Sequence, residues 1–174
     1  MGRGRGDSPL YQLIAGRDLE RELCPLATSE QVGLLIWSPL AGGFLSGKFS
    51  RERKGPDGAR RANFNFPPVD ETRGYLVLDA LAEVAHEQQV SIARVALAWL
   101  LHQTVTTSVI TGARDEAQLR DNLAAPEIEL DASQLERLDK ASALPPEYPG
   151  WMIAMQARDR LAALTPEQRF TKVT

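Results

Sequence analysis

The sequence has a single cysteine, no long apolar run and few histidines. One cysteine, Cys24, cannot form an internal disulfide, and its apolar neighbours predict that it packs in the interior. No run approaches the roughly 18 apolar residues of a membrane span, and the N-terminus has no apolar signal-peptide core. These absences predict a cytoplasmic protein with no membrane partner.

The sequence also lacks an excess of charge of one sign. It has 20 Lys and Arg against 23 Asp and Glu, for a net charge of −3, and the two signs are interleaved. No basic surface is therefore expected, which excludes nucleic acid as a predicted partner. Neither the G-x-G-x-x-G nor the Walker pattern occurs, so the common nucleotide-binding folds gain no support. The 174 residues suffice for one ordinary domain with a core.

Apolar periodicity predicts strands that alternate with helices. This alternation is typical of parallel βα units. The predicted helix caps are Ser91, Asp115 with Gln118, and Asp131 with Gln134. About three strands are present, which is few for a complete barrel. A polar connection over 49–69 is long enough to suggest a functional or disordered loop. The predicted strands are 11–14, 32–37 and 104–111, and the predicted helices are 18–27, 73–88, 91–101, 115 onward, 131–142 and 152–164.

One candidate anion site follows the predicted strand over 104–111. Small residues at Gly112 and Ala113 let a backbone approach an anion, and Arg114 offers a planar fork suited to phosphate. The next helix would aim its N-terminus at the same point. Gln118 and Asn122 share one face of that helix. An ordinary βα turn with solvated polar residues explains the spacing equally well, and nearby acidic residues partly offset the positive charge.

A second candidate site follows the strand over 32–37. Ser38, Leu40 and Gly42 supply a hydroxyl group and backbone amides, and Pro39 fixes the turn. Lys48 adds a cation, and Trp37 could stack on a ring. The alternative is that Trp37 belongs to the core and that the glycines only form a turn. Taken alone, this segment favours that alternative.

Together, the motifs resemble the aldo-keto reductases, in particular the bacterial branch related to potassium-channel β subunits. The resemblance implies a TIM (β/α)8 barrel. This chain is expected to be a partial barrel, with roughly the last three βα units and the C-terminal helices over 10–174. Residues 1–9 are expected to be a flexible, non-native leader. The similar segments are 37–48, 111–122, 11–26, 95–99 and 148–152.

The resemblance implies NADP(H) as the cofactor. Trp37 would then lie near the nicotinamide, the residues that follow it would hold the pyrophosphate, and Arg114 would meet the ribose 2′-phosphate. Gln118 and Asn122 would contact the adenosine end, and Arg60 in the long loop is a weaker candidate. The implied cofactor-binding set is Trp37, Ser38, Pro39, Leu40, Gly42, Lys48, Arg60, Gly112, Arg114, Gln118 and Asn122.

The family's hydride-transfer Asp, Tyr, Lys and His come from the first half of the barrel, and nothing in this chain matches their motifs. His86 and His102 fall near predicted helix ends, where an imidazole is favoured by the helix dipole. No catalytic or metal-binding residue is therefore assigned, and a small carbonyl substrate is expected only if the N-terminal half is supplied. The alternative is a noncatalytic nucleotide-binding or self-assembling fragment, natural or engineered. Open strand edges predict self-association or pairing with a complementary barrel fragment.

Overall fold

The structure is a computed structural model that describes residues 11, 13, 17–53, 55, 61 and 64–162. The chain divides into two units, Met1–Ala143 and Leu144–Thr174. Among the described residues, the first unit holds the strands and most of the helices, and the second holds one helix. Each unit is described by itself. The predicted leader over 1–9 lies outside the described residues.

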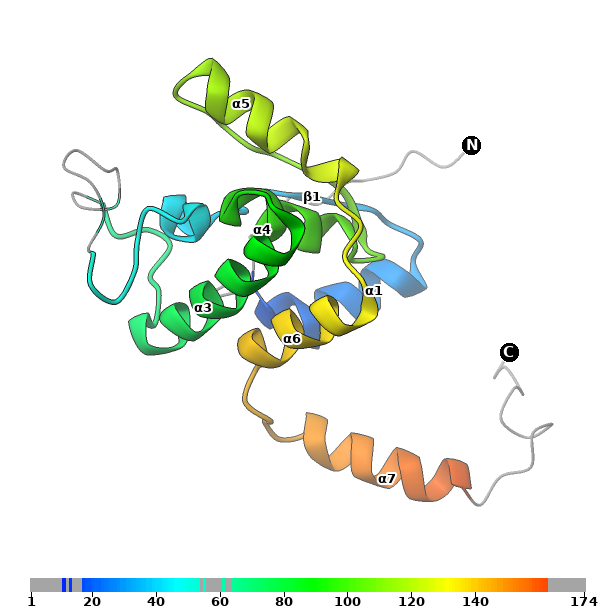
Figure 1. The fold of residues 1–174 in the computed structure, drawn as a ribbon. Helices are drawn as coiled ribbons and strands as arrows, with labels where there is room; N and C mark the ends of the chain where they lie inside the picture. The colour runs from blue at the N-terminus through cyan, green and yellow to red at the C-terminus, as the bar shows by residue number, and fades with distance from the viewer. Residues whose placement is uncertain are drawn as a thin grey trace, which may run out of the picture. The chain divides into compact units, whose positions relative to one another are not determined.

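Two parallel strands form the sheet of the described residues (Figure 1). β1 spans Leu34–Ile36 and β2 spans Thr106–Val109, so the predicted strands over 32–37 and 104–111 are confirmed in shorter form. Leu34 pairs with Thr106, but Leu35 pairs with Ser108, so a bulge leaves Thr107 without a partner on β1. The pairing is parallel because two helices connect the strands and return the chain to the same end of the sheet.

The predicted strand over 11–14 is not a strand at the two positions described. Tyr11 and Leu13 are both 1% exposed and join the core, but neither has strand structure. Gln12 and Ile14 lie outside the described residues. The prediction of three βα units therefore remains a prediction, with two of its strands observed.

The sheet is covered on one face. Leu34 and Ile36 are buried in the same apolar cluster as the helices, whereas Leu35 between them is 38% exposed. Successive side chains of a strand point to opposite faces, so the described part of the chain covers only one of them. In a complete parallel barrel both faces of a strand are buried, whereas Leu35 is exposed among the described residues.

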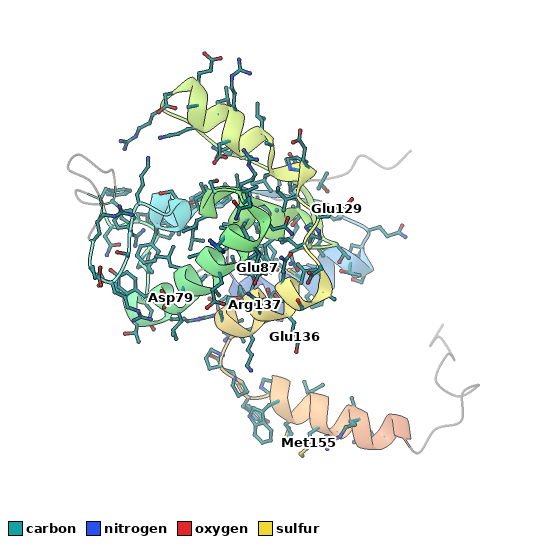
Figure 2. All side chains as sticks on the ribbon, viewed as in Figure 1. Asp79, Glu87, Glu129, Glu136, Arg137 and Met155 are labelled. Atoms are coloured by element: carbon teal, nitrogen blue, oxygen red, sulfur yellow. The ribbon has the colours of Figure 1, made fainter. Side chains whose placement is uncertain are left out.

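Three helices form the layer on the covered face. They are α3 (Glu71–Gln88), α4 (Ile92–Leu101) and α6 (Ala132–Ser142), with α3 packed against both of the others (Figure 1). Arg137 of α6 forms an ion pair with Glu87 of α3 at their contact, and both side chains are labelled in Figure 2. Trp99 of α4 is fully buried, and its indole N–H donates to Asp139 Oδ1 at 3.1 Å.

Side-chain caps begin these helices. Asp131 accepts the backbone N–H of Gln134, whose side chain returns to the Asp131 backbone, which completes the predicted capping box. The Ser91 hydroxyl accepts the Arg94 backbone N–H, as predicted. Asp70 caps α3 by accepting from Thr72 and Arg73, so this helix begins two residues before the predicted start at residue 73.

The single helix predicted over 18–27 is wrong. The structure has a 3-10 helix, η1, over Arg17–Arg21, followed by α1 over Leu23–Ser29. Pro25 lies in the first turn of α1, where its missing N–H costs no helical hydrogen bond. A proline at this place requires a new helix start, which explains the division. In the part of the first unit that the structure describes, the other elements are η2 (Ala41–Ser46), α5 (Glu116–Leu123) and η3 (Ala125–Glu127).

The second unit contains α7, which spans Gly150–Ala162 and confirms the predicted helix over 152–164 with slightly earlier bounds. Tyr148 and Trp151 meet edge to face, with ring centroids 6.5 Å apart. In the part of the chain that the structure describes, no helix is both long enough and apolar enough to cross a membrane. The same residues contain no cluster of His, Cys, Asp or Glu arranged to hold a metal ion.

Replacement of Leu81 tests the helical layer. Leu81 of α3 is fully buried, so Leu81→Ala should lower the free energy of unfolding by about 2–5 kcal/mol through lost burial and a residual cavity. Leu76→Ala on the same helix is the matched control because Leu76 is 53% exposed, and its effect should stay within about 0.5 kcal/mol. Urea unfolding measures both variants. Equal losses would contradict the packing described.

Candidate functional site

The two strands end side by side, and a cleft lies where they end. The backbone N–H of Ile110 donates to the Ile36 carbonyl at 2.7 Å, which fixes the carboxyl end of β1 beside that of β2. The segments that follow, 37–48 and 110–122, therefore lie close together at the carboxyl ends of the two strands. They line a cavity of about 720 Å³. This volume is within the range of pockets that hold small ligands.

The cleft gathers ten of the eleven residues predicted to bind a cofactor. They come from two segments separated by more than sixty positions in the sequence. Arg60, the eleventh, lies outside the described residues. The ten that line the cleft are Trp37, Ser38, Pro39, Leu40, Gly42, Lys48, Gly112, Arg114, Gln118 and Asn122.

Left-handed backbone conformations shape the turn after β1. Ser38 and Ala41 both have φ of 51°, and Gly42 follows with φ of 65°. These conformations are costly for residues other than glycine and are common where a backbone is shaped for a ligand. No hydrogen bond joins the backbone N–H of Leu40 or Gly42 to another described residue. Both amides therefore have no acceptor among the described residues.

Arg61 fixes this turn to the loop before α3. Its Nη1 donates to the Ala41 carbonyl at 2.9 Å and to the Pro67 carbonyl at 3.0 Å, and its guanidinium lies over the Phe44 ring. Burial lowers the pKa of the Arg61 guanidinium below its ordinary value, with Glu71 opposing the shift. Arg61 was not predicted from the sequence, because the pattern of the loop does not indicate that this arginine contacts the turn.

Trp37 is covered on one side by a protein ring. Its indole stacks on Phe66, with centroids 6.0 Å apart and planes 16° apart. Phe66 also lines the cleft and was not predicted. The only sequence signal was its aromatic character within a polar loop. Trp37 therefore has a ring partner on one side before any ligand binds.

The turn after β2 is open and cationic. A Cβ built on Gly112 would meet nothing within 4 Å, so the backbone here is accessible from the cleft. Arg114 is exposed, and its guanidinium has no hydrogen bond or ion pair with the described residues. The Arg114 backbone N–H donates to Gln118 Oε1 at 3.2 Å, and Asp115 caps α5 by accepting from the Gln118 backbone at 2.8 Å. The predicted cap is thus confirmed.

Asn122 is buried and forms hydrogen bonds within the protein. It is 8% exposed, and its Nδ2 donates to the Thr111 hydroxyl at 3.1 Å and to the Gly112 carbonyl at 3.4 Å. The side chain therefore holds the strand end in place. It still lines the cleft, on the same helix face as Gln118.

The acidic residues near the second segment interact with groups other than the Arg114 side chain. Asp115 is occupied as the α5 cap, Glu116 pairs with Arg120, and Asp121 pairs with Arg94. Lys48, on the other side of the cleft, is exposed and has no ion pair among the described residues. Among the described residues that line the cleft, the cations without an ion pair are therefore Lys48, Arg61 and Arg114, and they dominate the charge that a ligand would meet.

No Tyr or His is among the described residues that line this cleft. His102 ends α4, where its Nδ1 lies 2.8 Å from the Ala98 carbonyl, and His86 is exposed near the end of α3. Tyr75 packs on Phe44 with ring centroids 5.7 Å apart. The helix-end placement predicted for both histidines is confirmed.

A separate cavity of about 490 Å³ lies at the opposite, amino-terminal end of β2. It is lined in part by Tyr11, Arg17, Glu20 and Cys24. The Tyr11 hydroxyl donates to Glu20 Oε1 at 2.8 Å, and burial together with this bond raises the pKa of the phenol. Burial also raises the pKa of the Cys24 thiol, which is partly rather than fully buried. Arg17 forms a two-pronged pair with Glu20, so the charges of these two side chains are already paired.

A comparison with protein families confirms the resemblance of the sequence to the aldo-keto reductases. The model of the aldo/keto reductase family matches residues 8–143, which is most of the chain. The chain belongs to the aldo-keto reductase family. Its fold resembles the crystal structure of the thermostable aldo-keto reductase Tm1743 in complex with the inhibitor epalrestat. That likeness has a TM-score of 0.55 at 25% identity and covers 78% of this chain and 39% of that one.

Similar proteins include bacterial oxidoreductases and plant potassium-channel subunits. The oxidoreductase YrpG of Bacillus subtilis is 38% identical over 74% of this chain and 37% of its own length. A probable voltage-gated potassium channel subunit beta of Arabidopsis thaliana is 35% identical over 70% of this chain and 38% of its own. The NADH-specific methylglyoxal reductase of Escherichia coli is 33% identical over 75% and 40%. The chain thus spans half or less of the length of these relatives.

Replacement by alanine should change the stability differently at two glycines of the cleft. At Gly42 a Cβ would lie 2.5 Å from the Phe66 carbonyl oxygen at a φ of 65°, so Gly42→Ala should lower the free energy of unfolding by about 1–3 kcal/mol. Gly112→Ala places its methyl in open space and should leave stability unchanged or raise it by up to about 1 kcal/mol. Thermal and urea unfolding compare the pair, and a larger loss at Gly112 would contradict the geometry.

Proposed function

We propose that this chain is the NADP(H)-holding, C-terminal part of an aldo-keto reductase barrel. One observation carries the proposal: both predicted phosphate-binding segments line the same cleft, with their free amides and unpaired cations on its walls. Parallel barrels bind ligands at the carboxyl ends of their strands, and phosphate sites commonly follow the last two. The cleft lies at that end of β1 and β2.

The ribose 2′-phosphate would be held at Arg114. Its guanidinium is exposed and has no partner among the described residues, and its planar fork matches a phosphate monoester. Gly112 leaves the adjacent backbone open to close approach. α5 begins directly after, so its dipole favours a negative charge here. Gln118 and Asn122 would line the adenosine side.

The pyrophosphate would be held at the turn after β1. The Leu40 and Gly42 amides donate, Ser38 adds a hydroxyl, and Lys48 adds a positive charge. Trp37 would then meet the nicotinamide on the side that Phe66 leaves open. The bound cofactor would supply the hydride for reduction of an aldehyde or ketone. The residues of this chain bind and orient it rather than deliver a proton.

Proton donation to the substrate would need groups that are not among the described residues lining this cleft. Tyr75 and both histidines are placed elsewhere, and Tyr11 lines the other cavity and is bound to Glu20. We propose that turnover requires the family's Asp, Tyr, Lys and His from an N-terminal barrel half. By itself the chain would act as a noncatalytic nucleotide-binding module, which is the second candidate function.

Replacement of Arg114 tests both the site and the cofactor preference. NADPH titration should change Trp fluorescence, because Trp37 lines the cleft, and Arg114→Ala should weaken NADPH binding roughly tenfold or more through lost charge-assisted bonds. NADH binding should change little, since NADH lacks the 2′-phosphate. Arg120→Ala, on the exposed side of α5, is the control. Equal weakening of both cofactors would remove this assignment and favour a site like that of a relative named NADH-specific.

We also propose that the uncovered face of the sheet associates with another surface. Leu35 is 38% exposed and Ile110 53% exposed, on a sheet that has two strands in the described residues. Exposed strand edges and apolar faces favour association with a complementary barrel fragment or a second copy. Gel filtration with light scattering should show a concentration-dependent mass above 19.2 kDa. A monomer at all concentrations, with one sharp thermal transition, would contradict association.

A further inference from the structure

The loop before α3 supplies an aromatic ring to the cleft. Phe66 belongs to this loop, lines the cleft and is 44% exposed. Its ring stacks on the indole of Trp37, with centroids 6.0 Å apart and planes 16° apart. Aromatic pairs in this arrangement attract each other beyond the area that they bury. The contact therefore links the end of β1 to a loop that is distant in the sequence.

The backbone of Phe66 is held beside the turn after β1. A Cβ on Gly42 would lie 2.5 Å from the Phe66 carbonyl oxygen, so the two segments are in close contact. Arg61 donates to the Ala41 carbonyl at 2.9 Å and to the Pro67 carbonyl at 3.0 Å, which joins the turn to the residue after Phe66. The ring of Phe66 therefore projects from a backbone that the turn holds in place.

The stack restricts the indole of Trp37. This side chain is only partly buried, and an unrestrained side chain loses rotational freedom when it orders around a ligand. The contact with Phe66 removes much of that freedom before a ligand arrives. It also covers one face of the indole, so a planar ligand ring can stack only on the other face.

A second phenylalanine of the same loop gives a contrast. Phe64 is 54% exposed and is not among the residues that line the cleft. Its ring lies against that of Phe66, with centroids 5.7 Å apart and planes tilted by 34°. Loss of the Phe64 ring leaves the contact between Phe66 and Trp37 in place. The two phenylalanines thus separate the loss of any ring in the loop from the loss of the ring that meets the indole.

We infer that Phe66 is a positioning residue for the nicotinamide end of the cofactor. It holds the indole of Trp37 in one plane before binding, so that the nicotinamide stacks on the open face without first ordering that side chain. The inference rests on the proposed function and goes beyond it, because Phe66 acts through Trp37. Its effect is confined to the nicotinamide, whereas the phosphates are held by other groups of the cleft.

Two ligands that differ only in the nicotinamide test this inference. Calorimetry on the full chain measures the binding of NADP⁺ and of 2′-phospho-ADP-ribose, which keeps every phosphate and lacks the nicotinamide. Wild type should bind NADP⁺ more tightly. Phe66→Leu keeps an apolar side chain without a ring, so it should weaken NADP⁺ roughly two- to tenfold and leave 2′-phospho-ADP-ribose unchanged. Phe66→Met, a second ringless variant, should behave in the same way.

Two further variants serve as controls. Phe66→Tyr keeps the ring and should retain the wild-type affinity for both ligands. Phe64→Leu makes the same change in the same loop and should alter neither affinity. Because Phe66 and Phe64 are both largely exposed, all of these variants should remain folded, and thermal unfolding checks this.

The pattern of losses separates positioning from structure. If the ringless variants weakened both ligands equally, Phe66 would only shape the cleft, and the inference would be overturned while the proposed function stood. It would also be overturned if they bound NADP⁺ as well as wild type does, if Phe66→Tyr lost as much affinity as Phe66→Leu, or if Phe64→Leu did so. Wild type that binds NADP⁺ no more tightly than 2′-phospho-ADP-ribose has the same consequence. If wild type binds neither ligand, the proposed function fails and the inference fails with it.

Discussion

The pairing of β1 with β2 is the constraint on which the cleft depends. Because the strands are parallel, the segments after β1 and β2 leave the sheet at the same end. The hydrogen bond from Ile110 to Ile36 holds the two strands together there, at the last residue of β1. Each segment alone is a turn of small and polar residues. Only their adjacency makes a pocket with amides on one wall and a helix start on the other. The helical layer of α3, α4 and α6 supports this pairing from the covered face.

Helix starts could be predicted from the sequence because capping is a local interaction. The box of Asp131 with Gln134 and the Ser91 cap both lie within three residues of the groups they satisfy. The boundary at Pro25 was missed because helical periodicity continues across it, although the missing N–H of proline requires a new start.

The cleft-lining residues could be predicted largely because they follow the strands directly in sequence. Arg61 and Phe66 could not be found, since both enter the cleft from the long loop through contacts with Ala41 and Trp37 that no local pattern encodes. The ion pair between Arg94 and Asp121 could not be predicted either, because it depends on how α4 and α5 pack against each other. Sequence reasoning counted that acid as an offset to the positive charge. The roles of the individual cleft residues toward NADP(H) remain predictions.

The bulge in the sheet has a consequence for sequence variation. A Cβ at Gly33 would lie 1.8 Å from the Thr107 Oγ1, far inside van der Waals contact. The unpaired Thr107 side chain thus crosses the space that any other residue at position 33 would need. The two positions are sterically interdependent, so a larger residue at one requires a smaller residue at the other. Among folded variants of this chain, positions 33 and 107 would be expected to covary.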